Sequence, residues 1–314
     1  MNTDDLLSSL KGFRGCLLGL AAGDAVGTTV EFSKRGSFKP LNDMIGGGPF
    51  GLHAGQWTDD TSMALCLAIS LVQRDGFDPK DQMERYCRWW REGYLSSTGE
   101  CFDIGNTVSS ALARFLDTKE PFCGSTDPSS AGNGSLMRLA PVPMFFFPDR
   151  QQVIHFCAES SRTTHGAAEC LDACRLFGDM LCHALAGGGK ETILTVARPD
   201  KIACPSIRSI AGGEYRKKRR DDIESTGYVV HSLEAALWCF WKTTTFEEAV
   251  LEAANLGGDA DTTAAICGQI AGAHYGAAAI PDRWLARLAM RRDITKIADK
   301  LHAASVQRAK PPQR

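Results

Sequence analysis

Residues 57–73, WTDDTSMALCLAISLVQ, set the fold class of this 314-residue chain. Two aspartates and a threonine stand at the start, and a run dominated by apolar residues follows without a distinct polar face. A helix that is apolar all round is buried inside a larger protein rather than lying on its surface. The pattern therefore predicts a buried helix over Asp59 to Gln73.

Similar apolar segments recur along the chain, whereas strand-like alternation is scarce. Glycine-rich loops separate them, and no charged or proline-rich linker divides the sequence. We expect one compact all-α domain over residues 1–303 and a disordered tail over 304–314, because the end Lys310-Pro311-Pro312-Gln313-Arg314 cannot pack. The other expected helices are Phe13 to Ala25, Pro79 to Tyr94, Asn106 to Leu116, Arg150 to Ser160, Ala167 to Leu185, Glu191 to Arg198, Tyr228 to Trp241, Phe246 to Ala254, Thr262 to Tyr275 and Pro281 to His302.

The composition is that of an ordinary globular protein, with 44% apolar residues, 23% charged residues and a net charge of −2. This balance argues against a polyanion binder, and we expect no nucleic-acid partner. The basic run over residues 216–220 could contact phosphates. The acidic residues that follow it (Asp221, Asp222 and Glu224) favour a solvated face instead.

The twelve cysteines lie at irregular intervals, many of them inside apolar runs, and no Cys-x-x-Cys pair occurs. They are interpreted as buried thiols in a reducing compartment, not as disulfides or zinc ligands. The N-terminus carries acids where a signal peptide would be basic, and no apolar run is long enough to cross a bilayer. We expect a cytoplasmic protein without a transmembrane segment.

A second acidic helix start, GDADTTAA over residues 258–265, resembles the first. One interpretation is helix capping, since Asp, Ser and Thr satisfy free N–H groups at helix starts. One side chain would serve that purpose, however, and each start offers two carboxylates beside a threonine. If the four carboxylates converge, protons or cations must relieve their repulsion. The ligands would all be hard oxygens, which suit Mg²⁺, Mn²⁺ or Ca²⁺ and argue against zinc or copper.

Several motifs together resemble the ADP-ribosylglycohydrolase family, and most closely its bacterial branch of dinitrogenase reductase-activating glycohydrolases. The resemblance runs from about Phe13 to Leu288, nearly the whole chain, and its motifs occur in the family order. They are Gly23-Asp24-Ala25-Val26-Gly27, Glu31-Phe32, residues 55–63, residues 102–107, Ala131-Gly132-Asn133-Gly134-Ser135-Leu136-Met137-Arg138, Thr163-Thr164-His165-Gly166, residues 227–230 and residues 255–262.

The resemblance implies an all-α fold with two divalent cations, Mg²⁺ or Mn²⁺, in a central cleft. It places the metal ligands at Thr58, Asp59, Asp60, Asp259, Asp261 and Thr262. It implies catalytic roles for Glu31, beside the metals, and Asp103, the general base. Members often carry two acids after the Leu-Gly pair; here Gly258 precedes Asp259, outside the ligand set.

The remaining site residues are expected to bind substrate. Gly132, Asn133, Gly134 and Ser135 could form an anion-binding nest or a plain turn, and the resemblance favours a phosphate and ribose cradle. It also places His165, Asn106 and Tyr228 near ADP-ribose, with the Tyr228 ring either stacked on adenine or packed in the core. Asp24 either orients the acidic site or satisfies a buried backbone end.

The implied activity is removal of mono-ADP-ribose from a modified protein side chain, most closely arginine, which releases ADP-ribose. Dinitrogenase reductase is one candidate protein substrate. Three alternatives stay open: a non-enzymatic relative of the lens-crystallin kind, an immunity protein that blocks an ADP-ribosyltransferase toxin, and a hydrolase of another ADP-ribose linkage. The first would lack metal acids and the second would need an added binding loop; the sequence shows neither feature.

Overall fold

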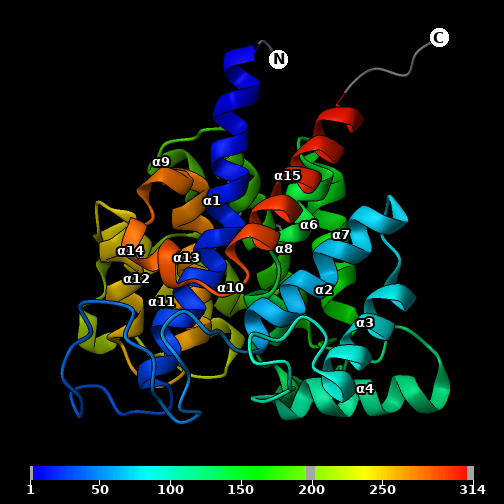
Figure 1. Ribbon diagram of the computed structural model, residues 1–314, viewed down its shortest axis with the longest axis horizontal. Helices are drawn as coiled ribbons and strands as arrows, with labels where there is room; N and C mark the ends of the chain where they lie inside the picture. Colours follow the sequence, from blue (N-terminus) through cyan, green and yellow to red (C-terminus); the bar gives the residue numbers. More distant parts are fainter. Residues whose placement is uncertain (1–2, 196–201, 310–314) are drawn as a thin grey trace.

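The computed structural model describes residues 3–195 and 202–309 and contains helices but no strand within those ranges (Figure 1). Backbone pairing of the β type is limited there to isolated bridges, such as Gly132 with Tyr228. The all-α prediction is confirmed. The α-helices are α1 (Thr3–Gly27), α2 (Asp59–Arg74), α3 (Pro79–Glu92), α4 (Asn106–Thr118), α5 (Gly134–Met137), α6 (Pro141–Phe146), α7 (Arg150–Arg162), α8 (Ala168–Leu185), α9 (Lys190–Ile193), α10 (Pro205–Ala211), α11 (Val229–Lys242), α12 (Phe246–Ala254), α13 (Ala260–Tyr275), α14 (Asp282–Arg287) and α15 (Arg291–Arg308).

Short 3₁₀ turns join several of these helices: η1 (Thr28–Val30), η2 (Pro128–Ser130), η4 (Glu214–Lys217), η5 (Arg220–Asp222) and η6 (Ala277–Ala279). Helix α1 runs through the middle of the molecule in Figure 1, with α2 to α4 on one side and α11, α12 and α14 on the other. A single apolar cluster extends from Phe13 to Leu301, so residues of nearly every long helix share one core. Helix α2 is buried over most of its length, as its sequence predicts.

Helices α1 and α13 pack backbone against backbone, because glycines recur every fourth residue on α1 at positions 15, 19, 23 and 27. A Cβ atom added at Gly19 would lie 2.3 Å from the carbonyl oxygen of Gly268, and one at Gly23 would lie 2.1 Å from that of Ala264. No larger side chain fits at those distances. The glycine stripe therefore sets the spacing between α1 and the second acidic helix start.

The prediction of one helix over Pro281 to His302 is wrong, because the helix is interrupted between α14 and α15. Met290 adopts a left-handed conformation with φ of 51°, and the neighbouring Ala289 bonds through its N–H to the carbonyl oxygen of Gly55. The Ala289 carbonyl accepts from the indole of Trp57. Contacts with a distant loop thus end a helix that the local pattern would continue.

Four further differences concern helix ends and short helices. Helix α15 continues to Arg308, so the expected tail does not begin at residue 304; residues 310–314 lie outside the described ranges. Helix α1 begins at Thr3, well before Phe13. The expected helix over Glu191 to Arg198 is represented by the single turn α9, and its end lies outside the described residues. Helices α5, α6 and α10 were not predicted, because four to seven residues show no helical period.

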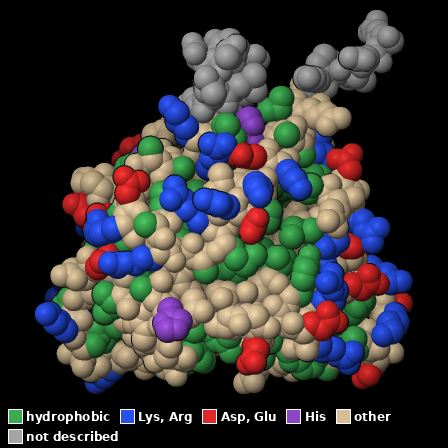
Figure 2. All heavy atoms as spheres, viewed as in Figure 1, with side chains coloured by type: hydrophobic (Ala, Val, Ile, Leu, Met, Phe, Trp, Pro, Cys, Tyr) green, Lys and Arg blue, Asp and Glu red, His purple; other side chains and the backbone are tan. Residues whose placement is uncertain are grey.

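The cysteines and the basic run are placed as predicted. All twelve cysteines are free, and all but the half-buried Cys101 are buried. The basic residues 216–220 each pair with an acid, in the order Glu191, Glu214, Glu234, Asp222 and Glu252. Figure 2 likewise shows charges of both signs interspersed on one face of the molecule. None of the described helices combines the length and apolar character needed to cross a membrane.

Candidate metal centre and active site

The start of α2 is capped from another helix. Asp24, a fully buried residue of α1, accepts through Oδ1 from the N–H and the hydroxyl of Thr58, both at 2.9 Å. Its Oδ2 accepts from the N–H of Thr61 at 3.0 Å and from the Thr61 hydroxyl at 2.6 Å. Asp24 thus does the work of an N-cap side chain. Asp24 satisfies a buried backbone end and also fixes the acidic helix start, so both interpretations of Asp24 apply.

The two acidic helix starts meet, although about 200 residues separate them in sequence. The hydroxyl oxygen of Thr58 lies 3.2 Å from Asp60 Oδ2 and 3.2 Å from Asp261 Oδ2. From the other side, Thr262 Oγ1 lies 3.4 Å from Asp60 Oδ2. Since the Thr58 hydroxyl has only one hydrogen and Asp24 accepts it in the shorter contact, its lone pairs face two carboxylates. Such a group of acceptors requires a cation or protons between them.

Capping does not explain these acids. Neither Thr58, the N-cap of α2, nor Asp259, the N-cap of α13, caps its helix through its side chain. Three buried carboxylate oxygens have no hydrogen-bond partner among the described residues: Asp60 Oδ1, Asp261 Oδ1 and Glu31 Oε2. A buried, unpaired carboxylate oxygen is costly, and such oxygens are the ligands that hard divalent cations prefer. The donor set therefore fits the metal site that the sequence implies.

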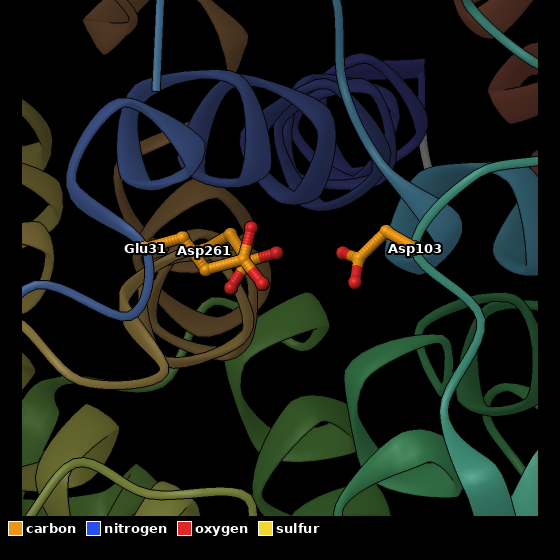
Figure 3. A group of neighbouring side chains, drawn as sticks. All are labelled: Glu31, Asp103 and Asp261. Carbon is orange, nitrogen blue, oxygen red and sulfur yellow. The ribbon is translucent and has the colours of Figure 1, made fainter. Parts of the chain in front are cut away.

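Glu31 and Asp103 complete the acidic group from two loops. Glu31 follows η1, and Asp103 precedes α4 in a left-handed conformation with φ of 53°. In Figure 3 the carboxylates of Glu31 and Asp261 lie side by side, and that of Asp103 faces them across a gap. One oxygen from each of the three residues lies within 4.8 Å of the others. The geometry would allow a cation or a substrate group to sit between the two sides.

Burial raises the pKa of every shifted carboxyl in this group, and the neighbouring negative charges add to the effect for most of them. The pKa of Glu31 rises to about 9, and that of Asp103 rises to about 7. Burial also raises the pKa of Asp24 to about 6, although its four hydrogen bonds oppose the rise. The pKa values of Asp59, Asp60 and Asp261 lie well above the ordinary range for the same two reasons. Without a cation, this centre therefore retains protons.

A cavity of about 550 Å³ opens directly above the acids. Its volume is within the range of small-molecule sites. Seven residues that the sequence assigns to the site line this cavity. They are the catalytic or metal-binding candidates Glu31, Asp59, Asp103, Asp259, Asp261 and Thr262, and the substrate-binding candidate Asn106. Thr58 and Asp60 are buried beneath that lining. Phe32 and Gly227 belong to the quoted motifs but were given no role, and Ser225 and Thr226 were not singled out; all four also line the cavity.

The predicted phosphate loop contributes part of the cavity wall. Gly132, Asn133 and Gly134 line it, whereas Ser135 lies below and accepts from the Ser161 hydroxyl at 2.8 Å. The N–H groups of Gly132 and Asn133 donate to the carbonyls of Ser130 and Gly227, so these two amides are not free to bind an anion. Asn133 Nδ2 instead donates to Asp259 Oδ2 at 2.6 Å, which orients that carboxylate.

His165 and Tyr228 are placed differently. His165 is buried and lines the cavity next to Gly134. Tyr228 does not line the cavity; its hydroxyl donates to Glu169 Oε2 at 2.6 Å on α8. The structure therefore does not bring the Tyr228 ring or Ser135 to the cavity. The sequence offered no signal for Glu169, which lies within an ordinary amphipathic helix.

Comparison with known proteins matches residues 5–311 to the ADP-ribosylglycohydrolase family. The chain is 44% identical over 294 residues to ADP-ribosylarginine hydrolase Tri1 of Serratia proteamaculans, covering 93% of this chain and 79% of that protein. It is 31% identical over 300 residues to ADP-ribosyl-(dinitrogen reductase) glycohydrolase of Rhodospirillum rubrum, covering 92% and 95%. A solved ADP-ribosylglycohydrolase-related protein complex superposes with a TM-score of 0.86 at 42% identity, over 95% of this chain and 99% of that chain.

Proposed function

This chain belongs to the ADP-ribosylglycohydrolase family, and we infer from that membership that it is a hydrolase removing mono-ADP-ribose from arginine side chains. We propose that it does so with two divalent cations, Mg²⁺ or Mn²⁺, held by Thr58, Asp59, Asp60, Asp259, Asp261 and Thr262. The convergence of unpaired carboxylate oxygens from α2, α13 and the Glu31 loop at the floor of one cavity carries this proposal.

The reaction breaks the bond between ribose C1 and a guanidine nitrogen and forms a bond from C1 to a water oxygen; the water gives up one proton, and the departing nitrogen takes one up. Bound divalent cations would supply an orienting contact for the ribose hydroxyls and lower the pKa of a water molecule. Asp103 takes the proton from the attacking water, because its carboxylate faces Glu31 and Asp261 across the gap in which the reacting group would lie (Figure 3). Glu31 lies beside Asp261 and holds the reacting sugar on the opposite side of the gap.

The remaining lining positions the nucleotide part of the substrate. Asn106 lies at the first turn of α4, Gly132 to Gly134 form one wall, and His165 lines the cavity beside Gly134. Asn133 acts indirectly, since its amide is committed to Asp259. Tyr228 supports α8 through Glu169 and is not part of the proposed contact surface.

The protein substrate carries ADP-ribose on an arginine. Dinitrogenase reductase is one candidate, because the chain shares 31% identity with the Rhodospirillum rubrum protein whose name specifies that target. The twelve free cysteines support a reducing compartment, the cytoplasm.

Incubation with an arginine-ADP-ribosylated protein, with and without a chelator, tests the proposal. We expect release of free ADP-ribose with Mg²⁺ or Mn²⁺, loss of release after chelation, and recovery when either cation is added back. The Asp59→Ala variant is the matched control and should remain inactive with both cations. Release from serine-linked but not arginine-linked substrate would overturn the assigned linkage. Inhibition of an ADP-ribosyltransferase without any release would favour the immunity alternative.

A further inference from the structure

Arg138, on the turn that follows α5, is fully buried, yet each of its hydrogen-bond acceptors among the described residues is neutral. Nη1 donates to the carbonyl oxygen of Gly134 at 3.1 Å. Nη2 donates to the hydroxyl oxygens of Thr163 at 3.2 Å and Thr164 at 2.7 Å. The guanidinium also lies over the ring of Tyr86. A buried charge without a carboxylate partner is costly, so its position next to the cavity wall calls for an explanation.

The hydrogen bonds around Arg138 have a fixed direction. An arginine side chain can only donate, so Thr164 Oγ1 must accept from it. Thr164 Oγ1 also lies 2.8 Å from Nδ1 of His165. If Nδ1 carried a proton, Thr164 would accept twice and its own hydrogen would lack a described partner in a fully buried position. The arrangement is satisfied when Thr164 donates to Nδ1 and the imidazole proton resides on Nε2.

The other nitrogen of His165 faces the cavity wall. A Cβ atom added at Gly132 would lie 3.4 Å from His165 Nε2, and one added at Gly134 would lie 2.8 Å from His165 Cε1. The ring therefore occupies space that a side chain at position 134 would need, whereas a Cβ atom at position 132 would lie at van der Waals distance from it. No hydrogen bond to another described residue engages Nε2, and His165 lines the cavity. The Nε2–H group is the part of the ring left for a bound ligand.

We propose that Arg138 and Thr164 are positioning residues that lock His165 into its neutral Nε2–H tautomer, so that the ring offers a permanent N–H donor to an oxygen of ADP-ribose. The part of this inference that concerns ADP-ribose rests on the proposed function; the tautomer does not. Burial, with the Arg138 charge, lowers the pKa of His165 to about 3, which agrees with a ring that stays neutral. Arg138 therefore remains charged beside Gly134, while His165 stays neutral.

The hydrogen bonds from Arg138 to Thr164 and from Thr164 to His165 form a relay. The variants Thr164→Val and Thr164→Ser separate this relay from simple packing. Valine has the shape of threonine but lacks the hydroxyl, whereas serine keeps it. Thr163→Val is the matched control, because Thr163 also accepts from Arg138 and is fully buried, but it donates to the Ser160 carbonyl rather than to His165. Melting temperatures of all three variants establish that they fold.

The first measurement is the tautomer of His165, read from imidazole ¹⁵N shifts in the full-length, cation-loaded protein without ADP-ribose. We expect the Nε2–H form in the native protein, in Thr164→Ser and in Thr163→Val, and a mixed or Nδ1–H form in Thr164→Val. An Nδ1–H or cationic ring in the native protein would overturn the proposal. Because Thr164→Val also removes an acceptor from Arg138, the native spectrum decides the matter if this variant does not fold.

The second measurement is ADP-ribose affinity by calorimetry. Loss of one well-oriented hydrogen bond to an anionic oxygen predicts roughly tenfold weaker binding for Thr164→Val. Thr164→Ser and Thr163→Val should bind like the native protein. Native tautomer and native affinity in Thr164→Val would refute the relay. If the native protein binds no ADP-ribose, the proposed function fails, and the ¹⁵N spectrum still tests the relay by itself.

Discussion

Replacing Asp24 with asparagine tests how α1 fixes the acidic start of α2. The carboxylate accepts four hydrogen bonds, two from Thr58 and two from Thr61. An amide is nearly the same size but offers one acceptor oxygen and one NH₂ group. Whichever way the amide is oriented, its NH₂ group faces a backbone N–H of α2. At least one buried backbone donor therefore loses its acceptor.

The expected cost follows from that count. A buried donor left without a partner costs about 1–3 kcal/mol, and loss of a negative charge at a helix N-terminus adds about 0.3–1 kcal/mol. We expect Asp24→Asn to lower the free energy of unfolding by roughly 1–4 kcal/mol. Because Thr58 shifts with the helix start, Mn²⁺ affinity should also fall, by roughly 10–100-fold, as for other residues that orient metal ligands.

The loss of stability is measured by urea unfolding in the presence of a chelator. The loss of Mn²⁺ affinity is measured separately, by calorimetry. Asp172→Asn is the control, since Asp172 is also buried and accepts from the N–H of Cys204, far from the acids in sequence and outside the cavity lining. It should lower stability and leave Mn²⁺ affinity unchanged. The reasoning would be refuted if Asp24→Asn matched the native protein in both stability and affinity.

Four further outcomes are expected. Asp261→Ala should abolish ADP-ribose release and keep the native far-ultraviolet circular dichroism; turnover in metal-free buffer would contradict the assignment. Asp103→Ala should bind ADP-ribose normally. In single-turnover assays it should cleave ADP-ribose from the modified protein roughly 10²–10⁴-fold more slowly, as expected for loss of a general base; cleavage at the parental rate would exclude that role. Gly23→Ala should destabilise the protein by at least about 1–3 kcal/mol in urea, because its Cβ would lie 2.1 Å from the Ala264 carbonyl oxygen; native stability would show that the helices are not in close contact. Chelated protein should melt at falling temperatures from about pH 5 to about pH 8, because the raised pKa values of Glu31, about 9, and Asp103, about 7, keep protons on the folded state that the unfolded chain has already released; a rising melting temperature would contradict the sign, and Mg²⁺ should stabilise most at the higher pH.

The sequence predicted the acidic helix starts well, because paired carboxylates before an apolar run are a local pattern. It could not show that Asp59 and Asp261 belong to one site. That contact depends on the glycines of α1, whose four-residue spacing allows α13 to approach. The spacing at positions 15, 19, 23 and 27 is visible in the sequence and was the available signal for this helix pair.

Other features lay beyond local patterns. The break at Met290 comes from contacts of Ala289 with Gly55 and Trp57, which no periodicity near residue 290 reveals. The sequence left the Tyr228 ring either stacked on adenine or packed in the core; in the structure it lies outside the cavity lining, and Glu169 accepts its hydroxyl. The cap that Asp24 provides is likewise tertiary, since it joins residues more than thirty positions apart.

A crystal of the native protein grown with Mn²⁺ tests the central claim most directly, because manganese is located by its anomalous scattering. The account predicts two manganese ions about 3.5–4 Å apart at the floor of the cavity, bound by oxygens of α2 and α13 that include Asp60 and Asp261. Absence of manganese there, with protons or solvent alone between the two aspartates, would contradict it.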